Sequence, residues 1–374
     1  MEQVGKVKFY PKHNLKGKVV YLILTGAKKI DLAPRIIKEL IDEEAKVITI
    51  LTQAALNLID TKSLEQIRGN FVKIDFDWSA NQKTRSIPEE DIVIIAPCTF
   101  NTLNKIYRGI ADSYPLTIIA TAIAKKKPVF IAPAFNEMWF HPLIQETISN
   151  LTQWGCRIIW PQITPQKVTM MDYRKVLDTV YFSQAIIRYN SLQFDSPDLK
   201  NELNHLTKTF SKSFLEIGRH QYKIGLNSGV SGCYSVKIDK SRFFITSTGA
   251  DLASLKKNQL TLVLKINKKK EVEWCGQNRP SSETPLHAAI YQAIPKAQAI
   301  VHSHCPRITY SPDLQSLATP HYIRHGEIAS YKSVIQQMQK QDGFVILRYH
   351  GEFAYGQSLK EACAKIEEYL PKTR

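Results

Sequence analysis

The chain has 374 residues, of which 44% are hydrophobic, and a formal net charge of +16. At about 150 residues per domain, this length predicts two or three domains. No apolar run reaches the roughly 18 residues of a transmembrane helix, and the lysines are dispersed without zinc-finger spacing or an aromatic and basic RNA-binding pattern. We therefore expect neither a membrane nor a nucleic acid as partner, although the basic surface can attract phosphorylated substrates.

The six cysteines are scattered without any CxxC pair. This pattern favours reduced thiols over a disulfide framework. The N-terminal residues, MEQVGKVKFYPKHN, lack the apolar core of a signal peptide. We therefore expect a cytoplasmic protein.

The first half of the chain alternates apolar strands with helices. Helical spacing is present over residues 31–45 and 141–154. Apolar runs that predict buried strands occupy residues 18–26, 45–52, 91–97, 127–133 and 156–161. Continuous apolar strands alternating with helices indicate an α/β fold with a doubly wound parallel sheet.

Ligands of such sheets bind beyond the carboxyl ends of the strands, so the loops there form a candidate site. These loops read TGA (25–27), LT (51–52), PCTFNT (97–102) and PAFNEMW (133–139). Together they resemble the flavin-containing cysteine decarboxylase family, which includes phosphopantothenoylcysteine decarboxylase, over roughly residues 17 to 162. The resemblance implies an FMN site between subunits, with cofactor-binding residues Thr25, Gly26, Thr52, Thr99, Asn101, Thr102 and Asn136.

The residue types in these loops suit a phosphate. Backbone amides at a helix N-terminus near Gly26 can hold an anion, together with the hydroxyls of Thr25, Thr99 and Thr102. Asn136 can bind a carboxylate or an amide, but an asparagine before a helix is as often an N-cap.

Two departures from this family bear on its chemistry. Ala27 stands where the family has a serine, and Lys28 can compensate for the lost hydroxyl. No histidine lies between His13 and His141, whereas the decarboxylases carry one several residues before the strand at 91–97. We therefore expect a flavin-binding fold, and decarboxylation of a cysteinyl compound is kept as an alternative function.

The stretch from 189 to 198 is polar and rich in turn residues, and it follows a predicted helix at 172–188. We place a domain boundary there, which gives a flavoprotein-like domain over residues 1–190 and a second domain over residues 199–374. The second domain opens with an amphipathic helix at 199–218. It is α+β in character, with strands expected at 233–238, 242–246 and 260–266.

The segment AQAIVHSHC, residues 297–305, predicts a strand, because it is apolar and too short for a typical helix. Side chains alternate along a strand, so His302 and His304 point the same way and can share a metal ion. A later strand-like segment carries His350. Three imidazoles leave tetrahedral Zn²⁺ one open position, which is the catalytic pattern, although Mn²⁺, Fe²⁺ or Co²⁺ also suit. Glu283 can then move protons beside that metal.

These residues resemble the class II aldolase and adducin family of zinc lyases over roughly residues 204 to 369. The resemblance rests on Pro280 to His287, on the His-x-His pair and on the late His350-Gly351. It implies Glu283 as the acid/base and His302, His304 and His350 as metal ligands. It also implies a substrate phosphate pocket, made by Ser231, Gly232, Thr248, Gly249, Ser281 and Ser282. The family usually has asparagine at the position of Cys233.

The principal hypothesis is a metal-dependent lyase fused to an FMN-binding domain. It would cleave or dehydrate a small, phosphorylated, sugar-like substrate through a zinc-stabilised enediolate, and the sequence does not choose among aldol cleavage, dehydration and epimerisation. The alternatives are an FMN-dependent decarboxylase of coenzyme A biosynthesis and a non-enzymatic, adducin-like association module. Both resemblances imply sites at subunit interfaces, so we expect a homo-oligomer.

Overall fold

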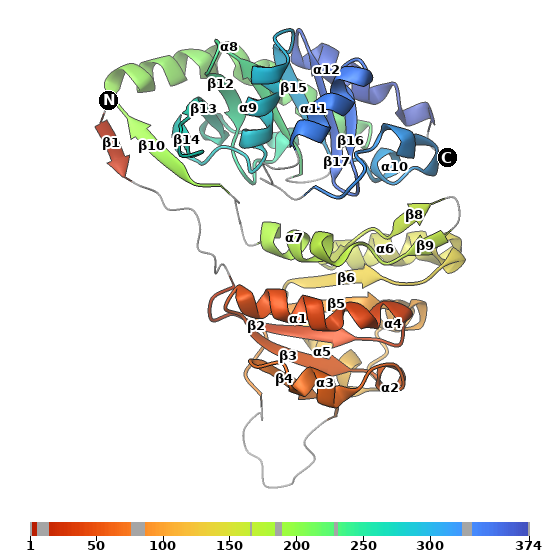
Figure 1. Ribbon diagram of the computed structural model, residues 1–374. Coiled ribbons are helices and arrows are strands. Elements are labelled where there is room, and N and C mark those ends of the chain that lie inside the picture. Colours follow the sequence, from red (N-terminus) through yellow and green to blue (C-terminus); the bar gives the residue numbers. More distant parts are fainter. Residues whose placement is uncertain are drawn as a thin grey trace. The chain divides into compact units, whose positions relative to one another are not determined.

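The computed structural model describes residues 2–5, 15–75, 87–164, 167–183, 189–227, 231–323 and 331–372. The chain forms two compact units (Figure 1). We call Lys12–Gln184 the parallel-sheet unit, and we call the combination of Met1–Pro11 with Ala185–Arg374 the mixed-sheet unit. Within the described ranges, no helix has the length and apolar character needed to cross a membrane.

The parallel-sheet unit is built on six parallel strands in the order β4-β3-β2-β5-β6-β7. Their bounds are β2 Val19–Leu24, β3 Lys46–Leu51, β4 Asn70–Lys73, β5 Ile92–Cys98, β6 Val129–Pro133 and β7 Cys156–Ile158. Every residue of β2, β5 and β6 is buried, because helices cover both faces of the sheet. This arrangement confirms the predicted doubly wound sheet.

The helices of this unit follow the strands in the expected alternation. They are α1 Ala33–Asp42, α2 Gln53–Leu56, α3 Thr61–Glu65, α4 Phe100–Tyr107, α5 Tyr114–Ala124, α6 Leu143–Gln153 and α7 Tyr173–Ser183. A small hairpin, β8 Gln162–Thr164 and β9 Lys167–Thr169, stands outside the main sheet. The helix predicted at 172–188 is present as α7, and its expected last five residues, 184–188, lie outside the described residues.

The carboxyl ends of the central strands bring three loops together. Strand β2 lies between β3 and β5. The strands β3 and β4 therefore extend the sheet on one side of β2, and the later strands β5, β6 and β7 extend it on the other side. The Ala134 N–H donates to the Cys98 carbonyl at 2.8 Å, which joins the loop after β6 to the end of β5. The Thr99 N–H donates to the Thr25 hydroxyl at 2.9 Å, which joins the loop after β5 to the end of β2. These loops form the edge where ligands of such sheets bind.

The mixed-sheet unit contains a sheet ordered β1-β10-β14-β13-β12-β11-β15-β17-β16. Among the strand pairs that the described residues form in this sheet, β10 and β14 are parallel and the others are antiparallel. The strand bounds are β1 Glu2–Gly5, β10 Ser191–Asp195, β11 Cys233–Lys237, β12 Phe243–Thr246, β13 Leu260–Ile266, β14 Val272–Cys275, β15 Ala299–Ser303, β16 Phe344–Leu347 and β17 Gly351–Gly356.

Two apolar cores cover the two faces of this sheet. The first contains Phe244 of β12 and side chains of α8 Pro197–Lys223 and α12 Leu359–Glu367. The second contains Phe243 of β12 and side chains of α9 Thr284–Ala293 and α11 Tyr331–Lys340. Because neighbouring residues of a strand point to opposite faces, Phe243 and Phe244 enter different cores. The helices therefore sandwich the sheet (Figure 1).

The connection between the units differs from the expected boundary. The stretch from 189 to 198, where the polar sequence predicted a domain boundary, contains strand β10 and the N-cap of α8, Ser196. Strand β10 pairs with β14 on one side and with the N-terminal strand β1 on the other. Backbone pairing, which a polar composition does not reveal, therefore places the first strand of the chain in the mixed-sheet unit.

Replacing Gly218 by alanine tests how closely α8 packs on this unit. A Cβ at Gly218 would lie 1.8 Å from the Leu252 carbonyl oxygen, so the helix or the facing backbone must move. Alanine favours helices by about 1 kcal/mol over glycine, but overpacking of this kind costs roughly 1–3 kcal/mol or more. We expect a lower melting temperature for Gly218→Ala, measured by calorimetry. The exposed α8 position Lys212→Ala is the control, and an unchanged melting temperature of Gly218→Ala would contradict the packing.

Candidate functional site

Three histidines from two neighbouring strands meet at one point of the mixed-sheet unit. His302 lies in β15, His304 follows its end, and His350 directly precedes β17, which pairs with β15. One ligand nitrogen from each ring lies within 4.8 Å of the others. The Nε2 atoms of His302 and His304 are 2.8 Å apart, and the His350 ring centroid is 5.2 Å from both other rings. The structure thus brings together the three predicted ligands.

The orientation of His302 is set by a backbone carbonyl. Its Nδ1 lies 2.8 Å from the Glu352 carbonyl oxygen, which can only accept a hydrogen bond, so Nδ1–H is the donor. The neutral ring then keeps its lone pair on Nε2, which faces His304. Phe353 stacks on the ring with centroids 4.0 Å apart. A carbonyl that fixes the tautomer in this way is the usual support of a metal-bound imidazole.

The donor set fits a divalent cation. In a tetrahedral zinc site with bonds of about 2.0–2.1 Å, two ligand nitrogens are roughly 3.3 Å apart. The two Nε2 atoms of His302 and His304 are 2.8 Å apart, slightly closer than that value. His302 and His350 are buried, so a cation held there would be largely shielded from water. Three imidazoles suit zinc and other divalent metals, and the predicted ligand roles stay a prediction.

Two glycines let the backbone approach His302. A Cβ on Gly351 would lie 2.3 Å from the Ser303 carbonyl oxygen and 2.8 Å from His302 Cε1. A Cβ on Gly232, whose φ is +85°, would lie 2.5 Å from the His302 carbonyl oxygen. The glycine after His350 is therefore a steric requirement, because any larger residue would push the third imidazole away from the first two.

Glu283 lies beside the three histidines. It is the N-cap residue of α9 and is buried, and its Oε1 is 3.7 Å from His350 Nε2. The Ser281 N–H donates to the Thr246 carbonyl at 3.1 Å, and the Glu283 N–H donates to Ser281 Oγ at 3.3 Å. The Tyr189 hydroxyl donates to the Pro280 carbonyl at 2.8 Å. A carboxylate held in this place is positioned to accept or deliver a proton at the cluster.

The predicted phosphate-binding residues surround the start of α9. The Thr248 N–H donates to the Arg279 carbonyl at 2.9 Å, which places the turn at Thr248 and Gly249 beside the segment of Ser281 and Ser282. Residues 231 and 232 precede β11, in which Cys233 is paired with His302. Both serines of the segment after Pro280 are buried. The phosphate role of the six predicted residues, Ser231, Gly232, Thr248, Gly249, Ser281 and Ser282, stays a prediction.

Sequence reasoning missed Glu352, which supports the cluster from β17. Its buried carboxylate accepts hydrogen bonds from Ser303 Oγ at 2.8 Å, from the Cys305 N–H at 3.1 Å and from the Thr309 hydroxyl. Burial raises the pKa of this carboxyl group to about 7, although the hydrogen bonds act to lower it. The sequence feature that could have revealed Glu352 is its position, since it is one acidic residue in an otherwise apolar strand, two positions after His350.

A second missed group centres on His287, one turn after Glu283 in α9. His287 Nε2 is 3.3 Å from Cys233 Sγ, and its Nδ1 is 2.7 Å from Ser235 Oγ. Ser235 Oγ is also 2.7 Å from the Tyr291 hydroxyl. Burial lowers the pKa of His287 well below its ordinary value, so the ring is neutral and uses one nitrogen as donor and one as acceptor. This chain of bonds ties α9 to β11.

The parallel-sheet unit has a pocket of about 560 Å³ at the carboxyl ends of its strands. Four of the predicted cofactor-binding residues line it, namely Gly26, Thr99, Asn101 and Asn136. The remaining lining residues are Ala27, Lys28, Lys29, Phe100, Ala134, Phe135, Met138, Val168 and Thr169. Its lining therefore combines polar and cationic residues with aromatic and apolar ones.

The other three predicted cofactor residues do not line this pocket, and their hydroxyls have structural partners. Thr25 is buried, donates to the Pro97 carbonyl at 2.8 Å and accepts from the Thr99 N–H at 2.9 Å. Thr52 caps α2 by accepting from the Ala55 N–H at 3.3 Å. Thr102 is buried, 2.9 Å from the Thr99 hydroxyl. These hydroxyls thus have partners within the protein, and the cofactor-binding roles of Thr25, Thr52 and Thr102 stay predictions.

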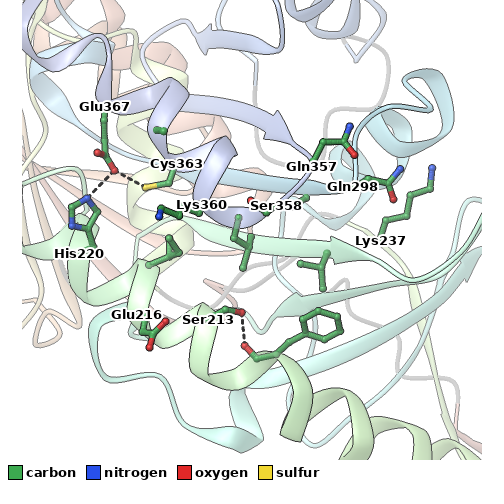
Figure 2. Close-up of a pocket in the computed structure, with 16 residues that line it drawn as sticks. Ser213, Glu216, His220, Lys237, Gln298, Gln357, Ser358, Lys360, Cys363 and Glu367 are labelled. Carbon is green, nitrogen blue, oxygen red and sulfur yellow. Dashed lines mark hydrogen bonds and ion pairs between the residues drawn. The ribbon is translucent and has the colours of Figure 1, made fainter.

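Cavity size does not identify the site. A hollow of about 870 Å³ lies between α8, α12 and the sheet of the mixed-sheet unit, and none of the three histidines of the cluster lines it. Figure 2 shows Glu367 between His220 and Cys363, with His220 Nε2 2.9 Å and Cys363 Sγ 3.0 Å from the same carboxylate oxygen. Burial raises the pKa of the Cys363 thiol, which makes it a poor nucleophile.

Comparisons with known proteins agree with both sequence resemblances. Residues 9–184 match the family described as Flavoprotein, and residues 212–370 match the family described as Class II Aldolase and Adducin N-terminal domain. The coenzyme A biosynthesis bifunctional protein CoaBC of Thermococcus kodakarensis is 28% identical over 167 residues, which are 44% of this chain and 41% of that protein.

Two further relatives extend the comparison. A probable phosphopantothenoylcysteine decarboxylase of Arabidopsis thaliana is 33% identical over 139 residues, 35% of this chain and 67% of that protein. A 3-oxo-tetronate 4-phosphate decarboxylase of Haemophilus influenzae is 31% identical over 117 residues, 29% of this chain and 53% of that protein. This chain thus covers less than two thirds of the Thermococcus and Haemophilus proteins.

The crowding at Gly351 predicts that Gly351→Ala reduces metal binding. The added methyl must displace the His302 ring or the Ser303 carbonyl, and either movement separates the ligand nitrogens. Gly356→Ala in the same strand is the matched control, because its Cβ would crowd the Ala362 nitrogen at 2.8 Å and not the histidines. We expect elemental analysis to find less zinc in Gly351→Ala than in Gly356→Ala. Equal zinc in both variants would contradict the steric role of this glycine.

Proposed function

Because this chain belongs to the flavoprotein family over residues 9–184 and carries a class II aldolase and adducin N-terminal domain over residues 212–370, we propose that it is a metal-dependent lyase fused to an FMN-binding domain. The observation that carries the proposal is the meeting of three imidazoles within 4.8 Å, with the Glu283 carboxylate 3.7 Å from His350. Its substrate class is a small, phosphorylated, sugar-like carbonyl compound.

The residues of this site divide the work of breaking a carbon–carbon bond. A bound divalent cation would supply Lewis acidity to an oxygen that gains negative charge as the bond breaks. His302, His304 and His350 would hold that cation, with the His302 ring fixed by the Glu352 carbonyl. The Oε1 atom of Glu283 would accept a proton from a hydroxyl group of the substrate. Glu283 would later return this proton to the substrate carbon. Burial of His302, His350 and Glu283 limits competition by water.

Ser281, Ser282 and the turn at Thr248 and Gly249 would bind the substrate phosphate. Hydroxyls and backbone N–H groups of such turns suit a phosphate, because small residues let the main chain approach its oxygens. The turn and the serine segment are joined by the hydrogen bond from the Thr248 N–H to the Arg279 carbonyl, 2.9 Å long. A phosphate held there would lie next to the start of α9, where Glu283 is located.

A second candidate reaction is decarboxylation of a phosphorylated 3-oxo sugar acid. It is favoured by the similarity to the Haemophilus influenzae protein, whose name describes this reaction. In that reaction the bond broken also lies next to a carbonyl-bearing carbon, so the same cation site serves. The proton transfers by Glu283 differ between the two reactions. In the decarboxylation carbon dioxide leaves, so Glu283 needs only to deliver a proton to the substrate carbon. Release of carbon dioxide instead of an aldehyde distinguishes the two reactions.

For the parallel-sheet unit we propose FMN binding in the pocket lined by Gly26, Thr99, Asn101 and Asn136. Decarboxylation of a cysteinyl compound in coenzyme A synthesis is the alternative function of this half, and the similarity to the Arabidopsis and Thermococcus relatives supports it. We also propose a homo-oligomer that acts in the cytoplasm on a small-molecule substrate. A purely adducin-like association role is disfavoured, since association alone does not require a buried carboxylate beside three imidazoles.

His302→Ala tests the metal centre directly. The native protein should contain about one zinc per chain, as a three-histidine catalytic site does, and the variant should contain almost none while it keeps its fold. His205→Ala, at an exposed position of α8, is the control and should keep the full zinc content. Elemental analysis measures the zinc content, and circular dichroism shows whether the variant is folded. Full zinc in a folded His302→Ala protein would overturn the metal assignment.

Glu283→Gln tests the acid/base role. The amide has nearly the same size but cannot exchange a proton, so we expect turnover to fall roughly 10²- to 10⁴-fold with unchanged zinc content. Turnover is measured on the substrate found by screening phosphorylated aldoses, ketoses and 3-oxo acids. Glu216→Gln, at an exposed position of α8, is the control. Turnover within about threefold of the native rate in Glu283→Gln would remove Glu283 from the mechanism.

A further inference from the structure

The residues that line the pocket of the parallel-sheet unit are of two chemical kinds, which we call its apolar part and its cationic part. Aromatic and apolar side chains form one part, with Phe100 packed edge to face on Phe135 at a centroid distance of 5.5 Å, beside Met138 and Val168. The other part contains Gly26, Thr99 and Asn101 together with the consecutive lysines Lys28 and Lys29. A planar ring system suits the first part, and an anion suits the second.

The threonine hydroxyls of the pocket loops already have partners within the protein. The Thr99 hydroxyl accepts from the Thr102 N–H at 3.3 Å and lies 2.9 Å from the Thr102 hydroxyl. The Thr25 hydroxyl, expected from the sequence to contact a phosphate, is buried between Pro97 and Thr99. The positive charge of the pocket lining therefore comes from the ammonium groups of Lys28 and Lys29.

These lysines are also available for a ligand. No ion pair with an acidic side chain is formed by either of them within the residues that the structure describes, although Lys16, Lys18, Lys105, Lys125 and Lys127 of the same unit all have one. Lys29 is half-buried at the pocket, whereas Lys28 is exposed. An anion that enters the pocket thus meets two ammonium groups without displacing a carboxylate from either.

We propose that Lys28 and Lys29 determine the cofactor specificity of this pocket, by binding the phosphate of FMN and so favouring FMN over riboflavin. The inference rests on the proposed flavin binding and assigns its phosphate selectivity to two residues. Riboflavin carries the same ring system without the phosphate, so the apolar part of the pocket treats the two flavins alike. The difference in their affinities therefore measures the contribution of the phosphate, and the lysine variants measure the share of Lys28 and Lys29 in it.

The test is to titrate FMN and riboflavin separately into the full-length protein and to follow the quenching of flavin fluorescence. Lys28→Ala/Lys29→Ala should weaken FMN binding by roughly tenfold or more, the effect of removing two cations near a dianion at a water-exposed site. Its riboflavin affinity should stay within about twofold of the native value. Lys28→Arg/Lys29→Arg should restore the preference for FMN, because it keeps both charges.

Lys46→Ala/Lys62→Ala is the matched control, because it removes the same charge from two exposed positions of the same unit that do not line the pocket. It should bind both flavins with the affinities of the native protein.

The same loss of FMN affinity in this control would attribute the effect to overall charge and overturn the inference. Equal weakening of both flavins in Lys28→Ala/Lys29→Ala would also overturn it, since the lysines would then shape the pocket. Binding of neither flavin to the native protein would instead refute the proposed cofactor itself.

Discussion

The candidate metal centre depends on the close antiparallel pairing of β15 and β17. This pairing places Ser303 opposite Glu352 and His302 opposite Phe353, so that His350, one residue before β17, meets His304, one residue after β15. His304 and His350 lie just beyond the paired residues of the two strands, where their side chains can turn toward His302. The approach is possible only because residue 351 has no side chain, as the 2.3 Å distance from a Cβ to the Ser303 carbonyl shows.

The groups around the histidines are polar and buried, and such groups are costly unless each finds a partner. Glu352 meets this condition with three hydrogen-bond donors and also holds His302 through its carbonyl. The neutral ring of His287 meets it by using both nitrogens between β11 and α9. These bonds restrict the movement of the elements that carry His302 and Glu283. A site built in this way keeps its geometry before any ligand arrives.

Much of the fold could be predicted from the sequence, because apolar periodicity reports burial directly. The uninterrupted apolar runs of β2, β5 and β6 indicated strands covered on both faces, and the two-residue spacing of His302 and His304 indicated a shared side of one strand. Glu352 and His287 could not be found in this way, since their roles come from partners about 50 residues away in the chain. The hydrogen bond of the Thr25 hydroxyl could not be foreseen for the same reason, because its partner Pro97 lies 72 residues away.

The boundary between the two units illustrates the same limit at a larger scale. Composition placed a domain boundary in residues 189–198, yet β10 within this stretch pairs with β14 on one side and with β1 on the other. The parallel-sheet unit is therefore inserted in the chain between two adjacent strands of the mixed sheet, β1 and β10. A fragment that began at residue 199 would lose both strands and expose the edge of β14, a surface prone to pairing with other chains. The mixed-sheet unit thus depends on segments from both sides of the flavoprotein domain, so the two halves are joined by more than a simple end-to-end fusion.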